Sequence, residues 1–274
     1  MSGFSVDWLN LREPADQRAR NSGLLNKAVA FLVETEGSSE SEIVVDLGAG
    51  TGSSFRAMQP LLASHPKMQT WRLIDNDPVL LAEAMRRLQG KTEAEACEQN
   101  LNHIDVLPLT GVRMVTASAL FDLVSASYID QLVTKLAEAA QNTSLCFCAA
   151  LNYDGTTQWD PVHPLDTEVL NAFNRDQQTD KGFGPALGPA ACNYMQQALE
   201  EAGFTVELAS SPWKLDAEDA ELVAELIQGI AAAVRSDPEM DARAVDQWVE
   251  YRIANSQTGR CTVGHTDLLA ILAK

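Results

Sequence analysis

A short apolar run that ends in an acid and three alternating glycines constrains this chain more than any other feature. Residues 43–45, Ile-Val-Val, have the β-branched apolar character of a parallel strand that helices cover on both faces. Asp46 follows, and the glycines after it allow a sharp turn and a close approach of a ligand to the main chain. These glycines are Gly48, Gly50 and Gly52. Because residues 53–63 have helical apolar spacing, the stretch predicts a strand, a turn and a helix around a nucleotide or nucleoside pocket.

The spacing of the glycines separates two kinds of nucleotide site. A dinucleotide-binding turn has the pattern G-x-G-x-x-G, and Ser53 stands where its third glycine is needed. The pattern D-x-G-x-G-x-G is complete, and it resembles motif I of the class I S-adenosylmethionine (SAM)-dependent methyltransferases. The resemblance implies that the turn passes under the methionine part of SAM. It also implies cofactor contacts from Asp46, Gly48, Ala49, Gly50 and Gly52.

A second acid lies where a ribose would need it. Residues 71–75 are expected to form the next strand, with Asp75 at its carboxyl end. An acid there, roughly 20 or more residues after the glycines, accepts hydrogen bonds from ribose hydroxyls in dinucleotide folds, and the resemblance implies the same for SAM. Asp75 is therefore the expected ribose ligand, with Asn76 beside it under the adenine. Its alternative role, capping the next helix, is better filled by Asp77 before Pro78.

The order of strand-like and helix-like segments predicts an α/β fold with a doubly wound sheet. The resemblance implies a seven-stranded, mostly parallel Rossmann-like sheet, whose last strand runs antiparallel between the fifth and the sixth. The strands are expected at 43–45, 71–75, 95–104, 112–118, 144–151, 204–208 and 261–272. We expect one domain, 1–274, made of an N-terminal helical lid, a SAM-binding core, a substrate loop region and a helical insertion before the last strand. Their ranges are 1–40, 41–151, 152–190 and 216–257.

Further cofactor contacts are expected after the third and fourth strands. The resemblance implies that an acid or amide after the third strand meets the adenine amino group, and Gln99, Asn100 and Asp105 are the candidates. Ser118 ends the fourth strand and is expected to face the transferring methyl, because open α/β sheets bind ligands at strand ends. The following Ala-Leu-Phe lacks the two prolines that nucleic-acid amino-methylating relatives carry there, so base methylation is disfavoured.

Residues 152–189 are rich in Gly, Pro, Asp and aromatics, and we expect them to form the substrate-binding loop over the methyl donor, with a short helix at 167–174. A base is needed only if the acceptor is a hydroxyl or a protonated amine. The catalytic candidates are His163, whose unperturbed pKa lies near neutrality, and then Asp160, Tyr153 and Asp166. The alternative for His163 is a loop histidine that ties down its own turn.

The segment before the first strand is expected to form one or two helices over residues 7–36, with a break at Pro14. A leading helix lies over the cofactor as a lid in many small-molecule methyltransferases. In such a lid, Arg12, Arg18 or Arg20 would meet a carboxylate of SAM or of the substrate. The alternative is a solvated helical face with local ion pairs.

The composition of the chain limits the kinds of molecule that it is expected to bind. A formal net charge of −18 disfavours nucleic acid and anionic membrane surfaces. No basic leader with a long apolar segment and no apolar run of roughly 18 residues is present, so we expect a cytoplasmic protein that does not enter the membrane. The five cysteines form no C-x-x-C pair and the four histidines are scattered, so we expect no metal site.

The wider pattern, with an early Leu-Arg-Glu-Pro-Ala-Asp and a later Asp-Lys-Gly-Phe-Gly-Pro, resembles a bacterial group of uncharacterised small-molecule methyltransferases. The expected function is therefore methyl transfer from SAM to a small-molecule acceptor by in-line displacement. Two alternatives remain, a non-catalytic SAM-binding regulator or partner subunit and a nicotinamide-dependent oxidoreductase. The helical insertion is expected to form either a small lobe or the surface of a homodimer.

Overall fold

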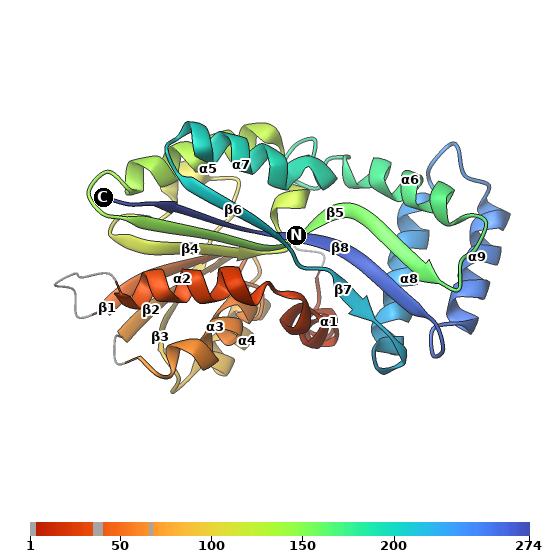
Figure 1. Ribbon diagram of the computed structural model, residues 1–274, viewed down its shortest axis with the longest axis horizontal. Helices are drawn as coiled ribbons and strands as arrows, with labels where there is room; N and C mark the ends of the chain where they lie inside the picture. Colours follow the sequence, from red (N-terminus) through yellow and green to blue (C-terminus); the bar gives the residue numbers. More distant parts are fainter. Residues whose placement is uncertain (1–3, 35–40, 66–67) are drawn as a thin grey trace.

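The computed structural model describes residues 4–34, 41–65 and 68–274, and an eight-stranded sheet runs through their centre (Figure 1). The strand order is β3-β2-β1-β4-β5-β8-β6, with β7 paired to β8 outside this path. Strands β1 to β5 run parallel to one another, and β8 runs antiparallel to its neighbours β5, β6 and β7. The strands are β1 Ser41–Leu47, β2 Met68–Asp75, β3 Glu93–Glu98, β4 Val112–Ser118, β5 Leu145–Asp160, β6 Thr205–Ser210, β7 Trp213–Leu215 and β8 Arg260–Leu272.

Helices cover both faces of the sheet. Helices α2, α3 and α4 pack on one face, where the core includes Leu24, Phe55 and Leu81. Helices α5 and α7 pack on the other, around Leu132 and Met195. The helices are α1 Val6–Ala19, α2 Ser22–Glu34, α3 Ser53–Leu62, α4 Pro78–Leu88, α5 Ala126–Ala139, α6 Asp166–Gln177, α7 Ala191–Glu201, α8 Ala220–Val234 and α9 Ala242–Ala254. The predicted doubly wound α/β architecture and the antiparallel last strand are confirmed.

The prediction of seven strands is wrong by one. Residues 209–213 are predicted from the sequence to form an edge or hairpin arm, but β6 takes up the first two of them and the short strand β7 beside β8 begins only at Trp213. The third strand is also shorter than expected and starts earlier, since residues 99–103 turn back and Ile104–Val106 form a 3-10 turn. Asn100 accepts from the amide of Asn102 in this turn, which competes with strand pairing.

The largest correction concerns residues 152–160, which were expected to be loop. Strand β5 continues through them to Asp160 and pairs with β8. The Asp154-Gly155 sequence marks a β-bulge, because the register shifts between Tyr153 and Thr157 and Gly155 has a φ of +89°. A helix expected at 167–174 is confirmed as α6, Asp166–Gln177.

The extended parts of β5 and β8 carry a second lobe. Helices α6, α8 and α9 surround them at the right of Figure 1, and this lobe has its own apolar core. The core includes Trp213, Ile227, Trp248 and Val263, and Ala15 of helix α1 packs into it. The predicted insertion of two amphipathic helices is confirmed as α8 and α9. It is therefore a lobe built on the same strands as the core, with helix α1 contributing from the N-terminal side.

Helix α1 runs straight through Pro14, so the predicted break is wrong. Pro14 lies on the exposed side of the helix, while Glu13 on one side and Asp16 on the other are fixed by contacts with other elements. These contacts offset the backbone hydrogen bond that proline removes. The chain leaves the helix at Arg20, whose ψ is 134°.

A buried carboxylate joins the two lobes. The side chain of Asp267 on β8 accepts hydrogen bonds from the amide of Leu151 (2.7 Å), the hydroxyl of Ser211 (2.6 Å) and the amide of Asn21 (2.7 Å). Leu151 has a φ of +58° at the point where the register of β5 shifts. Asp267 thus fixes the bend of β5, the link between β6 and β7, and the start of helix α2.

Two features bear on the class of protein. Among the described residues, no helix is long and apolar enough to cross a membrane. Cys146 and Cys148, which are two residues apart on β5 and share one side of it, are buried in the core beside α2 and α3. Residues 1–3 and 35–40 of the predicted N-terminal lid lie outside the described residues.

The second lobe offers a test of its packing. The guanidinium of Arg252 is almost fully buried, pairs with Asp166 and donates to the carbonyl of Pro161 (2.6 Å). We expect Arg252→Met to lower the free energy of unfolding by about 3 kcal/mol, because it leaves the carboxylate of Asp166 without its partner. Arg235→Met, which breaks the exposed pair with Asp246, is the control and should cost less than about 1 kcal/mol. Urea unfolding monitored by circular dichroism measures both, and equal costs would contradict the assignment.

Candidate functional site

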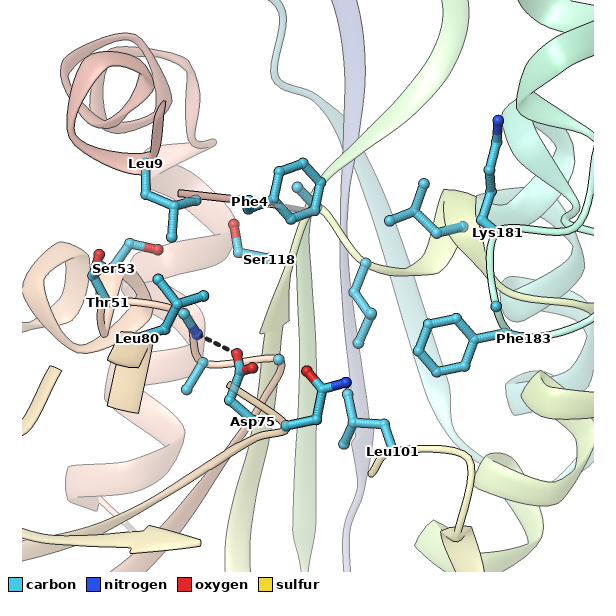
Figure 2. Close-up of a pocket in the computed structure, with 18 of the residues that line it drawn as sticks. Phe4, Leu9, Thr51, Ser53, Asp75, Leu80, Leu101, Ser118, Lys181 and Phe183 are labelled. Carbon is cyan, nitrogen blue, oxygen red and sulfur yellow. Dashed lines mark hydrogen bonds between the residues drawn. The ribbon is translucent and has the colours of Figure 1, made fainter. Parts of the chain in front are cut away.

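A cavity of about 270 Å³ lies at the carboxyl ends of the parallel strands β1, β2 and β4 (Figure 2). Its floor comes from the glycine turn after β1, the end of β2, the turn after β3 and the end of β4. Helix α1 and the segment 181–183 complete it from two opposite sides. Of the predicted cofactor residues it is lined by Gly48, Ala49, Gly50, Asp75, Asn76, Asn100 and Ser118.

The glycine turn adopts a conformation that few other residues tolerate. Gly48, Gly50 and Gly52 have φ values of +63°, +52° and +83°. The turn is fixed to the sheet by the amide of Ala49, which donates to the carbonyl of Ile74 (3.0 Å). A Cβ atom on Gly50 would lie 3.2 Å from Cδ1 of Leu9 and would occupy space between the turn and helix α1. The turn thus keeps an open path along its main chain.

The carboxylate of Asp75 connects the turn to the end of β2. Its Oδ2 accepts from the amide of Gly50 (2.8 Å; dashed line in Figure 2), and its Oδ1 accepts from the amide of Asp77 (3.0 Å). Burial raises the pKa of Asp75, and these backbone amides oppose the rise. Because each carboxylate oxygen has two acceptor sites, Asp75 keeps acceptor capacity toward the cavity while its orientation is fixed.

Asp46 lies behind the turn and does not line the cavity. Its side chain is buried, and neither carboxylate oxygen has a hydrogen-bond partner among the described residues. Burial raises the pKa of Asp46 to about 7, against the nearby hydroxyl of Ser54, which lies outside ideal hydrogen-bond geometry, and the attraction of Arg20. Gly52, the other predicted cofactor residue outside the lining, is packed against Leu88 of helix α4. Asp46 and Gly52 therefore support the glycine turn from the side that faces away from the cavity.

The end of the cavity near the turn after β3 is lined by two leucines, and a hydrogen bond there attaches the segment 181–183. Leu80 of α4 and Leu101 after β3 line it beside Asn76 and Asn100. Of the three candidates for an adenine contact, Asn100 lines the cavity, while Gln99 and Asp105 do not. The side chain of Asn102 donates to the carbonyl of Gly182 (2.9 Å), so the segment 181–183 is attached to the turn after β3.

Ion pairs hold helix α1 over the glycine turn. Glu13 accepts from Arg56 of α3 (2.8 Å to Nη2) and lies 3.5 Å from Nη1 of Arg87 of α4. Both arginines are largely buried, and the guanidinium of Arg56 also donates to the carbonyl of Thr51 in the turn. Helix α1 therefore covers this edge of the cavity, where a lid was predicted.

The three arginines of the predicted lid have different partners. Arg12 lines the cavity and is bound to Asp16 (2.9 and 3.1 Å), and Arg18 is bound to Asp219. Arg20 donates to the hydroxyl of Ser118 (2.9 Å) at the end of β4. Two of the three thus make ion pairs within the chain, and Arg20 is the one that reaches Ser118, which was expected to face the transferring methyl.

The predicted catalytic residues lie outside the cavity. His163, Asp160 and Tyr153 are absent from the cavity lining, because β5 carries them into the second lobe. Nδ1 of His163 accepts from the amide of Leu165 (3.2 Å), and its ring packs on Tyr251, so it ties down its own turn. The hydroxyl of Tyr153 donates to Asn174 (2.9 Å). The structure does not bring these residues to the expected site of transfer.

Sequence reasoning missed several lining residues that lie far from the motifs. Leu9 and Phe4 come from the N-terminal segment, and Lys181 and Phe183 belong to the Asp-Lys-Gly-Phe-Gly-Pro stretch. The only available signal was the resemblance carried by that stretch. Within it, Asp180 accepts from the amides of Gly182 (2.7 Å) and Gly184 (3.1 Å), which fixes a compact turn.

No protein-family model and no curated protein matches the sequence. Among solved structures, the cyclopropane synthase MmaA2 from Mycobacterium tuberculosis has 11% sequence identity and a TM-score of 0.55, over 98% of this chain and 95% of that chain. The cyclopropane synthase CmaA1 with S-adenosylhomocysteine (SAH) and CTAB has 10% identity and a TM-score of 0.48, over 91% and 83%. A geranyl diphosphate methyltransferase with SAM has 9% identity and a TM-score of 0.43, over 90% and 84%.

The similarity to MmaA2 extends over nearly the whole of both chains. Together with the strand order and the cavity at the ends of β1, β2 and β4, it shows that this chain has the fold of the class I SAM-dependent methyltransferases. Among residues 4–34, 41–65 and 68–274, no group of three or more His, Cys, Asp or Glu side chains is arranged to hold a metal ion.

Asp46 makes the stability of the protein depend on pH. Its folded-state pKa of about 7 lies above the 3.8 of an exposed aspartate, so its contribution to stability is complete below pH 4 and is lost as the pH rises through 7. We expect wild-type stability to fall by up to roughly 1.4 kcal/mol per pH unit between pH 5 and 7 from this group, and Asp46→Asn to remove that slope. Urea unfolding at four pH values measures it, with the exposed Asp105→Asn as control. Identical slopes in wild type and Asp46→Asn would refute the assignment.

Proposed function

We propose that this protein binds SAM in the cavity and transfers its methyl group to a small-molecule acceptor. The observation that carries the proposal is Asp75, whose carboxylate is fixed by the amide of Gly50 at the edge of the cavity. A nucleoside bound at the strand ends would place its ribose hydroxyls beside this carboxylate. The positive φ values of the turn and its open main chain fit a ligand that lies flat along it.

The charges behind the turn fit the methionine end of SAM. Asp46 is a buried carboxylate without a hydrogen-bond partner among the described residues, and Arg20 reaches Ser118 at the lining. Arg20 is thus a positive group at the end of β4, which suits the carboxylate of a methionine moiety, while Asp46 supports the turn from behind. SAM supplies an already activated methyl group, so the protein has to bind, orient and exclude water.

A small-molecule acceptor is favoured by the cover over the cavity. Helix α1 and the segment 181–183 close it from opposite sides, through Glu13 with Arg56 and through Asn102 with Gly182. A folded macromolecule would have to displace these contacts to present a reacting atom. The net charge of −18 further disfavours nucleic acid.

Calorimetry with SAH tests the cofactor, and NAD serves as the competing ligand. We expect SAH to bind with a stoichiometry of one and to raise the melting temperature, since a ligand of the native state stabilises it. Methyl transfer is then measured with methyl-labelled SAM and a small-molecule extract. Stabilisation by NAD and none by SAH would refute the proposal, and SAH binding without any labelled product would favour a regulator or partner subunit.

Replacement of Asp75 tests the ribose contact. We expect Asp75→Asn to weaken SAH binding roughly 10- to 100-fold, because hydrogen bonds to a charged group contribute about 1.5–3 kcal/mol. Glu98→Gln is the matched control, because Glu98 is exposed and pairs with Asp75 across the neighbouring strands. Its SAH affinity should stay within about twofold of wild type. Equal effects of the two substitutions would argue against a ribose at Asp75.

Two glycine-to-alanine variants separate the effect of backbone strain on stability from the effect of a side chain in the cavity on SAH affinity. Gly50→Ala and Gly90→Ala both place a side chain at positive φ, which costs roughly 1–2 kcal/mol. Only Gly50 lines the cavity, and a Cβ on Gly90 would meet nothing within 4 Å. We therefore expect both variants to lose stability, and only Gly50→Ala to lose SAH affinity, by at least about tenfold. Calorimetry and thermal unfolding measure the two effects.

A further inference from the structure

Part of the cavity lining is apolar and belongs to none of the predicted cofactor positions, and we call its side chains, which come from more than one side, the apolar wall. It is formed by Phe4, Leu9, Leu120, Leu123 and Phe183. In Figure 2 the rings of Phe4 and Phe183 come from opposite sides of the cavity, with Ser118 and Leu101 nearby. The ring of Phe183 is held edge-on against Tyr128, with the ring centroids 5.2 Å apart. This wall is a preformed surface for an apolar, flat or aliphatic group.

The ionisable groups of the lining are already engaged. In the described part of the chain they are Arg12, Asp16, Asp75 and Lys181. Asp16 accepts three hydrogen bonds, from Nε and Nη2 of Arg12 and from the indole of Trp213 (2.9 Å). Both oxygens of the Asp16 carboxylate are therefore engaged by donors of the chain.

The remaining cation of the lining is also neutralised. Nζ of Lys181 lies 2.7 Å from Asp176, and in Figure 2 it points away from the other labelled side chains. Asp75 accepts from the amides of Gly50 and Asp77 at the nucleoside end of the cavity, and its remaining acceptor sites are assigned to the ribose in the proposed function. The apolar wall is therefore not next to an uncompensated charge, and a charged acceptor would lose its hydration there without gaining a partner.

We propose that the acceptor is an uncharged, apolar molecule whose reacting atom carries a free lone pair at neutral pH, such as a weakly basic ring nitrogen. This inference rests on the proposed function and names its acceptor class. The transfer balances without a proton: the acceptor's lone pair forms the new bond to the methyl carbon, and the electron pair of the broken carbon–sulfur bond stays on sulfur. The products are a methylated cation and uncharged sulfur, so no residue has to act as a base.

Three bicyclic aromatic compounds of similar size test this class. Quinoline offers a neutral ring nitrogen, 2-naphthol offers a hydroxyl that must lose a proton, and 2-naphthoate is an anion. Each is incubated with the protein and methyl-labelled SAM, after SAH binding has been established by calorimetry. We expect N-methylquinolinium at a rate at least about tenfold above either other product, with the pH dependence of kcat/KM set by the ionisation of quinoline alone.

The outcomes separate this inference from the proposed function. Failure of SAH to bind refutes the proposed function, whereas SAH binding with faster methylation of 2-naphthol or 2-naphthoate refutes only the acceptor class. SAH binding with no product from any of the three, and no binding of quinoline to the SAH complex, also refutes it.

Two variants locate the acceptor at the apolar wall. We expect Phe183→Ala to raise the KM for quinoline about tenfold and to leave SAH affinity within about twofold, since an aromatic contact contributes about 0.5–1.5 kcal/mol beyond area burial. Val162→Ala, at an exposed position of the second lobe, is the control and should change neither value. An unchanged KM in Phe183→Ala would overturn the placement.

Discussion

The buried carboxylate of Asp267 is the interaction on which the arrangement of both lobes depends. It lies on β8 and binds the bend of β5 at Leu151, the link to β7 at Ser211 and the first turn toward helix α2 at Asn21. Three donors satisfy a charge that would otherwise be costly to bury. Because the bend directs β5 away from the core sheet, the second lobe begins here. The same contact fixes where helix α1 ends and helix α2 begins, and so fixes the cover of the cavity.

The site itself is built by backbone more than by side chains. The glycine turn, its bond to Ile74 and the amide of Gly50 on Asp75 give the cavity its polar floor. Side chains from distant segments then add the cover, through Glu13 on one side and Asn102 on the other. This division is common in open α/β sheets, where the strand ends provide a fixed ligand position and the surrounding segments vary.

The sequence predicted what local chemistry determines. Alternating glycines after a β-branched strand, and an acid at the end of the next strand, were sufficient to place the floor of the cavity and the order of the sheet. The extension of β5 was missed because Asp154-Gly155 resembles a loop, while its pairing partner on β8 lies about a hundred residues away along the chain. The apolar wall was missed for a related reason, since Phe4 and Phe183 come together only through tertiary packing. His163 was favoured as a base on its chemistry alone, and the path of β5 takes it elsewhere.

The continuity of β5 and β8 limits how ligands can enter. Both strands run unbroken from the core into the second lobe, and each lobe packs its own apolar core against them. A hinge rotation between the lobes would have to break the ladder that joins them, at the cost of several backbone hydrogen bonds at once. A substrate therefore enters past the segments that cover the cavity, which are helix α1 with its ion pairs and the turn at 181–183. That turn is held by Asn102, by the packing of Phe183 on Tyr128 and by the ion pair of Lys181 with Asp176. All three are side-chain contacts, so displacing the turn breaks no strand pairing of the sheet.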